Sequence, residues 1–147
     1  STRVREAYFL DYAHAIRQVA MMPLMVTGGF RSRDGMETAL ADGDTDIIGI
    51  ARPLCTHVDC PRRLLAGDID ELPAFERQLT LRARGWLSPA SPLLLAKMVN
   101  VLGAQGWYYQ QMDRIADGCE PDLDRGVLRS FLRYWWDDLT RAAQMER

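Results

Sequence analysis

The chain has 147 residues, of which 48% are hydrophobic, with 18 Lys and Arg against 20 Asp and Glu. That apolar fraction is typical of a globular domain, and the near balance of charge leaves no strong field to hold nucleic acid or an anionic membrane. No apolar stretch reaches the roughly 20 residues of a membrane span, and the start lacks the apolar core of a signal peptide. Three cysteines fit a reducing compartment. We therefore expect a cytoplasmic protein that binds neither nucleic acid nor membrane.

The first half of the chain alternates predicted helices and strands. Apolar residues recur with a helical period from Val4 to Ala20. Leu24–Val26 and Thr45–Ala51 carry apolar runs without alternation, which fit strands buried on both faces. A short helix capped by Ser32 or Asp34 lies between them. A crossover of this length allows only parallel pairing, so the pattern predicts an α/β unit.

The second half is predicted to be mostly helical. "CPRRLLAGD" indicates a short helix ending at Gly67, and "AFERQLTLRAR" indicates another helix. A helical period then runs from Met98 to Ile115, with Gly118 as its stop. A final helix carries a broad apolar stripe, formed by Val127, Leu128, Phe131, Leu132, Trp135 and Leu139.

Small residues and an arginine follow the two predicted strands. Gly28 and Gly29 leave backbone N–H groups unshielded, and the next helix is expected to aim its positive end at the same place. Arg52 follows the second strand and can offer a charged fork to a phosphate. Ligands of parallel α/β folds bind at the carboxyl ends of strands. The pattern predicts a phosphate site; the alternative is two tight turns with Arg52 in a surface ion pair.

Other reactive residues favour ordinary structural roles. Cys55, His57 and Cys60 suggest zinc, but only Cys119 or His14 could be a fourth ligand, so we predict no metal site. We interpret His14 as a partly exposed helix residue, and we assign no catalytic residue. The aromatic side chains of the last third lie at helical spacing, which is typical of a core rather than of a stacking platform: Trp107, Tyr108, Tyr109, Trp135 and Trp136.

Four motifs then identify a family. "EAYFLDYAHAIR", "PLMVTGGFRS", "ALADGDTDIIGIARPL" and "LLAGD" resemble, in order and spacing, the C-terminal part of the Old Yellow Enzyme family of NADH:flavin oxidoreductases. "GWYYQQMDRIADGCEPD" resembles that family's C-terminal helical region more loosely. The resemblance implies the last two βα units of a TIM (β/α)8 barrel over residues 1–68, followed by a mostly helical C-terminal extension over residues 69–147, helix-rich as a fragment.

The resemblance also implies a cofactor site. It places Gly28 and Gly29 against the phosphate of FMN from the seventh barrel strand, and Ala51 and Arg52 against it from the eighth. Phe30 would lie near the flavin ring. Many family members have glycine at the position of Ala51, and an alanine methyl is small enough to be tolerated there.

The family's activity would belong to a parent protein. Such enzymes pass hydride from NAD(P)H through FMN to an electron-poor alkene, using residues on earlier strands that lie outside this chain. A barrel needs about 250 residues, so we expect a C-terminal fragment, inactive alone. Its exposed strand edges and apolar faces predict self-association. The alternatives are a piece of another FMN- or phosphate-binding barrel, such as dihydroorotate dehydrogenase or the glycolate-oxidase group, or a free-standing helical assembly module.

Overall fold

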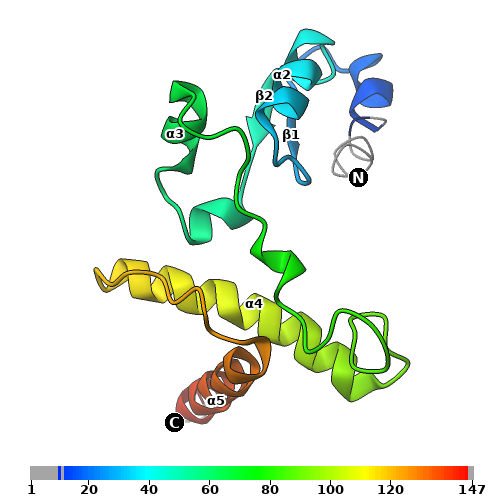
Figure 1. The fold of residues 1–147 in the computed structure, drawn as a ribbon. Coiled ribbons are helices and arrows are strands. Elements are labelled where there is room, and N and C mark those ends of the chain that lie inside the picture. Colours follow the sequence, from blue (N-terminus) through cyan, green and yellow to red (C-terminus); the bar gives the residue numbers. More distant parts are fainter. Residues whose placement is uncertain (1–9, 11, 146–147) are drawn as a thin grey trace. The chain divides into compact units, whose positions relative to one another are not determined.

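The computed structural model describes Leu10 and residues 12–145. The chain divides into two compact units, Ser1–Ala74 and Phe75–Arg147. The boundary predicted from the sequence lies six residues earlier, after Asp68. The first unit holds β1 (Met25–Thr27), α2 (Arg33–Ala41), β2 (Ile47–Gly49), the 3₁₀ turn η1 (Arg52–Cys55) and α3 (Cys60–Ala66) (Figure 1). The second holds the 3₁₀ turn η2 (Phe75–Arg77), α4 (Leu94–Ala116) and α5 (Val127–Met145).

β1 and β2 form a two-stranded parallel sheet, as predicted. Met25, Val26 and Thr27 stand opposite Ile47, Ile48 and Gly49, and α2 makes the crossover. The prediction that both strands are buried on both faces is wrong within this chain. Met25 is 62% and Ile47 51% exposed, because β1 and β2 are the only strands among the described residues and leave part of the sheet uncovered.

α2 begins and ends where the sequence indicated. Ser32 is the N-cap, and its hydroxyl accepts a hydrogen bond from the Gly35 N–H at 3.2 Å. Met36 and Ala39 are buried, while Gly43 follows the helix with φ of 74°. The core of this unit is one apolar cluster between α2, α3 and the loops, formed by Phe30, Met36, Ala39, Cys60, Leu64 and Leu72.

The buried Thr45 ties the start of β2 to β1. Its hydroxyl lies 2.9 Å from the carbonyl oxygens of both Leu24 and Ile47, and it accepts a hydrogen bond from the Val26 N–H at 3.2 Å. One hydroxyl proton serves one carbonyl at a time, so the two acceptors share it. This side chain therefore fixes how the two strands enter the sheet.

Asp46 links the same strands to the preceding helical segment, residues 12–17. Its carboxylate accepts hydrogen bonds from Arg17 at 2.5 and 3.0 Å and from the Leu24 N–H at 2.8 Å. The bond from Arg17, followed by that from Leu24, lowers the pKa of Asp46. Residues 4–9 and 11 of the predicted first helix lie outside the described residues.

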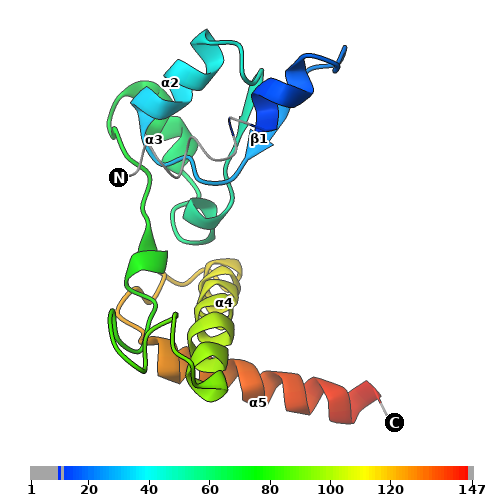
Figure 2. The ribbon, with the colours of Figure 1, turned by 90° about the vertical axis from the view of Figure 1, so that its right-hand side faces the viewer.

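The second unit is built from α4 and α5, which cross one another (Figure 2). The helical period, the stop at Gly118 and the final helix are confirmed. Gly103 and Gly106 lie where α5 comes closest. A Cβ on Gly103 would lie 2.5 Å from the carbonyl oxygen of Val127, and one on Gly106 would lie 2.7 Å from the Cβ of Tyr134. Glycine lets the two helices approach this closely.

The prediction of a helix over "AFERQLTLRAR" is wrong. Only the 3₁₀ turn Phe75–Arg77 forms there, and an irregular segment follows it. The buried side chain of Asn100 holds this segment: its Oδ1 accepts from the Leu81 N–H at 2.8 Å, and its Nδ2 donates to the Leu87 carbonyl at 3.0 Å. A polar residue on α4 thus supplies the hydrogen bonds that a helix would have made internally.

The aromatic residues divide between core and surface. Trp107 is fully buried against Phe75, with ring centroids 5.3 Å apart, as expected of a core residue. Tyr109, Trp135 and Trp136 are exposed, so the predicted core role is wrong for these three.

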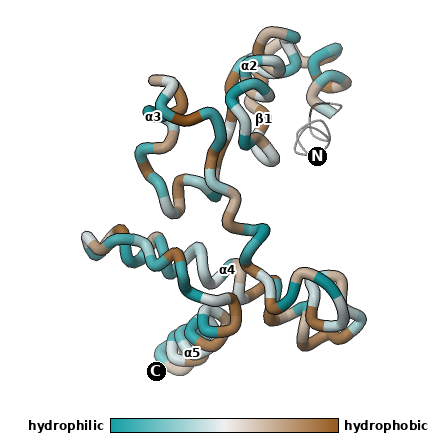
Figure 3. The backbone as a smooth tube through the Cα atoms, viewed as in Figure 1, coloured by the Kyte–Doolittle hydropathy of each residue, from teal (hydrophilic) through white to brown (hydrophobic). Residues whose placement is uncertain are grey.

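Figure 3 colours the backbone by hydropathy, with hydrophobic residues in brown. On α5, Val127 is buried against α4, whereas Leu128, Leu132 and Leu139 of the predicted apolar stripe are exposed. Within the described residues, no helix is long and apolar enough to cross a bilayer.

Gly103→Ala should destabilise the second unit. Alanine gains about 0.8–1.0 kcal/mol in helix propensity, whereas overpacking costs about 1–3 kcal/mol. The obstructing atom is a backbone oxygen that cannot rotate away. We expect a net loss of stability in urea unfolding followed by circular dichroism at 222 nm. Gly126→Ala, where an added Cβ meets nothing within 4 Å, is the control; equal behaviour of the two variants would contradict close packing at Gly103.

Asp46→Asn should remove a pH-dependent part of the stability. The folded-state pKa of Asp46 lies below its unfolded value, so the ion pair with Arg17 stabilises the fold above the unfolded pKa. That contribution is lost as the pH falls below about 4. We expect a lower urea midpoint for the variant at pH 7 and convergence with the wild type near pH 3, with exposed Asp68→Asn as the control. Parallel curves at all pH values would refute the linkage.

Candidate anion-binding site

The five residues singled out from the sequence lie around one small hollow at the carboxyl ends of β1 and β2. The hollow has a volume of about 40 Å³. Parallel pairing places the end of each strand at the same edge of the sheet, which brings the two segments together. The residues that line it are Thr27, Gly28, Gly29, Phe30, Arg31, Gly49, Ile50, Ala51 and Arg52.

Gly28 and Gly29 form the turn that leaves β1. Their φ angles are 113° and 83°, a region that residues with a side chain rarely adopt. Glycine is therefore required at both positions. It follows that no side chain stands between the backbone and the hollow there, which leaves room for a ligand to approach the main chain.

Gly49 ends β2 beside the same hollow. A Cβ at this position would lie 2.0 Å from Oγ1 and 2.9 Å from Cβ of Thr27, its partner in the strand register. The Thr27 side chain is therefore what Gly49 approaches. The absence of a side chain on Gly49 thus keeps the two strand ends in register at the hollow.

Ala51 and Arg52 lead from β2 into η1. Arg52 is the first residue of this turn, which the fully buried Pro53 anchors, and the Leu54 N–H donates to the Ala51 carbonyl at 2.9 Å. Ala51 has φ of −131°, which any residue adopts, so the backbone does not demand glycine there. The Arg52 side chain is exposed and supplies positive charge at the rim.

Phe30 lines the hollow but is only 1% exposed and belongs to the apolar core. In this chain Phe30 packs in the core and also lines the hollow, and its position near a flavin ring stays a prediction.

The N-terminus of α2 contributes less than expected. The Arg33 N–H donates to the Asp70 carbonyl at 2.8 Å, and the Gly35 N–H is taken by the Ser32 cap. The Leu72 N–H donates to the Arg31 carbonyl at 2.7 Å, so the segment after α3 is fastened across the start of α2. Two of the first three N–H groups of α2 are therefore already engaged within the chain.

The cysteine and histidine cluster gives no metal centre in this part of the chain. Cys60 is buried in the core, and His57 Nδ1 lies 3.0 Å from the hydroxyl of Thr56. Burial raises the pKa of the Cys55 and Cys60 thiols, which keeps them protonated at neutral pH. Among the described residues, no three His, Cys, Asp or Glu side chains lie together as metal ligands would. His14 is exposed and contacts Asp44 at 3.2 Å.

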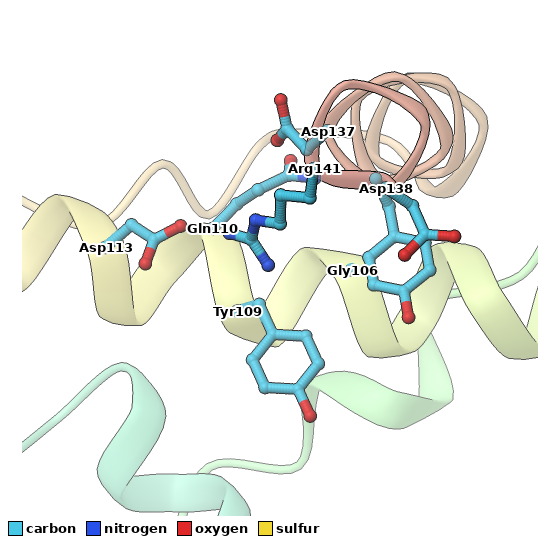
Figure 4. Close-up of a pocket in the computed structure, with 8 residues that line it drawn as sticks. Gly106, Tyr109, Gln110, Asp113, Asp137, Asp138 and Arg141 are labelled. Atoms are coloured by element: carbon cyan, nitrogen blue, oxygen red, sulfur yellow. The ribbon is translucent and has the colours of Figure 1, made fainter. Parts of the chain in front are cut away.

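A second hollow of about 360 Å³ lies in the second unit, where α4 and α5 cross. Figure 4 shows Tyr109, Gln110 and Asp113 on α4 and Asp137, Asp138 and Arg141 on α5. The Asp137 carboxylate accepts from Arg133 at 2.9 Å, and Tyr109 stacks on Tyr134 with ring centroids 6.4 Å apart. The hollow is thus lined by charged and polar side chains from both helices.

Known proteins match part of the chain. It is 47% identical over 62 residues to the NADH-dependent flavin oxidoreductase iccE of Talaromyces variabilis, a match covering 42% of this chain and 15% of that protein. It is 50% identical over 58 residues to the NADH-dependent flavin oxidoreductase iliE of Neonectria sp. (strain DH2), covering 39% of this chain and 8% of that protein. A protein of the latter name from Hypocrea jecorina (strain QM6a) is 38% identical over 61 residues, covering 41% and 15%.

The matched segment is thus similar to part of proteins named NADH-dependent flavin oxidoreductases, which confirms the resemblance that the motifs indicated. The match spans at most 15% of the length of these relatives. No protein-family model matches the chain. No solved structure matches it either.

Gly49→Ala should disturb the site without touching Arg52. The added methyl would overlap the Thr27 side chain, so the ends of β1 and β2 must separate. We expect a loss of stability of about 1–3 kcal/mol, with altered amide signals around Gly28 in nuclear magnetic resonance spectra. Thr27→Ala in the same chain should restore only part of the loss, because a Cβ would remain 2.9 Å away. Unchanged stability in the Gly49→Ala variant would contradict the close approach.

Proposed function

We propose that the chain is the phosphate-holding part of an FMN-dependent NAD(P)H oxidoreductase, formed by the last two βα units of a TIM barrel and a helical extension. One observation carries the proposal. The glycine turn at Gly28 and Gly29 and the cationic Arg52 meet at the same end of two parallel strands, in a chain that matches NADH-dependent flavin oxidoreductases. Barrel enzymes bind phosphate at the ends of strands 7 and 8.

The hollow fits a phosphate group better than a ring system. Its volume of about 40 Å³ is too small for a flavin ring. A turn without side chains offers backbone N–H donors, and a guanidinium at the rim offers charge and paired donors, which is the chemistry that phosphate prefers. Ala51 adds a side chain small enough to leave the approach open. These features support FMN, whose terminal phosphate would enter while its ring lies outside the hollow.

In this function the chain binds and orients and makes no bond. The flavin supplies hydride transfer when bound, from NAD(P)H to an electron-poor alkene. Gly28 and Gly29 would hold the phosphate through their backbone, and Arg52 would neutralise its charge. Phe30 and Gly49 would keep the two strand ends in place. The groups that contact the ring and the substrate would come from segments beyond this chain, so the chain alone is expected to lack activity.

Arg52→Gln should weaken FMN binding to the 147-residue chain while leaving riboflavin unaffected. A hydrogen bond to a charged group contributes about 1.5–3 kcal/mol, so we expect the dissociation constant for FMN to rise about tenfold or more. Quenching of flavin fluorescence measures both ligands. Riboflavin lacks the phosphate and should bind weakly to both forms.

The matched control is Arg62→Gln, an exposed arginine on α3 outside the hollow. It should leave FMN binding at the wild-type value. Equal affinity of the wild-type chain for FMN and riboflavin would show that the phosphate is not recognised. An unchanged FMN affinity in Arg52→Gln would remove Arg52 from the site even if FMN is preferred.

A further inference from the structure

A second surface of the first unit has no role in the proposed flavin site. A groove of about 460 Å³ runs between α2, β2 and α3 and is lined mainly by apolar side chains. Some of these are well exposed: Leu40 is 44% and Leu65 86% exposed, and Ile47 on β2 is also exposed. A contiguous apolar surface of this kind marks an interaction site, because burying it releases water from apolar area.

Arg33 stands at this groove with part of its side chain buried and unsatisfied. Its Nε and Nη2 atoms have no hydrogen-bond partner among the described residues. The guanidinium lies beside Gly67, where an added Cβ would be 3.6 Å from Nη1 and Nη2. Arg33 is also the first residue of α2, where the positive end of the helix dipole disfavours a cation. The Nη1 atom is not among these buried atoms, so it is the part of the guanidinium that an acceptor from outside this unit can reach.

The carboxylates that line the groove do not satisfy Arg33 within the chain. Asp46 is engaged by Arg17 and by the Leu24 N–H. Glu37 is exposed and lies one turn along α2, yet neither it nor Arg33 forms an ion pair with another described residue. Within one helix, an ion pair between residues four apart is weaker when the arginine precedes the glutamate than when the glutamate comes first. Two opposite charges thus remain available on one face of α2.

We propose that this groove is a self-association surface and that its occupant is a second copy of the chain. In a contact with two-fold symmetry, residue i meets residue j of the partner and the reverse. Two α2 helices laid antiparallel across the axis bring Arg33 of each copy to Glu37 of the other, forming two equivalent ion pairs. Leu40, Ile47 and Leu65 lie around these pairs and become buried in the contact. This surface is independent of the flavin site.

The test reverses one charge at a time. Arg33→Glu and Glu37→Arg each place like charges opposite one another in a contact between identical copies. Like charges across an interface strongly disfavour a contact, so each variant alone should show a dissociation constant at least about tenfold above the wild type. Sedimentation velocity over a range of concentrations measures this, and circular dichroism checks the fold. Arg62→Glu, an exposed charge reversal on α3 outside the groove, should associate like the wild type.

Complementary variants give the decisive result. An equimolar mixture of Arg33→Glu and Glu37→Arg restores both opposite-charge pairs, so it should form a heterodimer at concentrations where each variant alone is monomeric. The double variant Arg33→Glu/Glu37→Arg should again form a homodimer. Misfolded variants could not recover in this way. The proposal would be overturned if the wild type is monomeric or if the mixture stays monomeric. It would also be overturned if neither charge reversal affects association, and that result would point to the exposed residues of α5 instead.

Discussion

Parallel pairing of β1 with β2 is the constraint on which the candidate site depends. Because the strands run in the same direction, their carboxyl ends share one edge, and Gly28 meets Arg52 there although α2 separates them in sequence. The pairing is set at the opposite end, where Thr45 accepts a hydrogen bond from the backbone of β1 and Asp46 accepts one from Leu24, the residue just before β1. The residues that shape the site thus include polar side chains that lie far from it.

Glycines have different physical tasks in the two units. At Gly28 and Gly29 the backbone adopts positive φ, so the requirement lies in the main-chain conformation itself. At Gly49 and Gly103 the conformation is ordinary, and the requirement is space for a neighbouring strand or helix. The first pair keeps a surface free of side chains at a ligand site, whereas the second pair holds packed elements together. Only the first kind points directly to function.

Local signals in the sequence identified much of the fold, and the five residues predicted to hold the cofactor are among the nine that line the hollow. Helical periods, the Ser32 cap and the crossover length depend on neighbours in sequence, so α2, α3, α4, α5 and the parallel strands could be predicted. The failures concern distant partners. Hydrogen bonds from Asn100 replace a predicted helix, and periodicity on α5 reveals an apolar face without showing whether this chain covers it. The bond from Arg33 to Asp70, which occupies the start of α2, was equally invisible.

The central claim is that the backbone at the strand ends recognises the phosphate of FMN. Amide chemical shifts of the isotopically labelled chain, recorded with FMN and with riboflavin, test it most directly. The account predicts that FMN shifts the signals of Gly28, Gly29 and Arg52 in a saturable way, while riboflavin leaves them unchanged. Shifts of equal size with both ligands, or FMN-dependent shifts confined to α4 and α5, would contradict it.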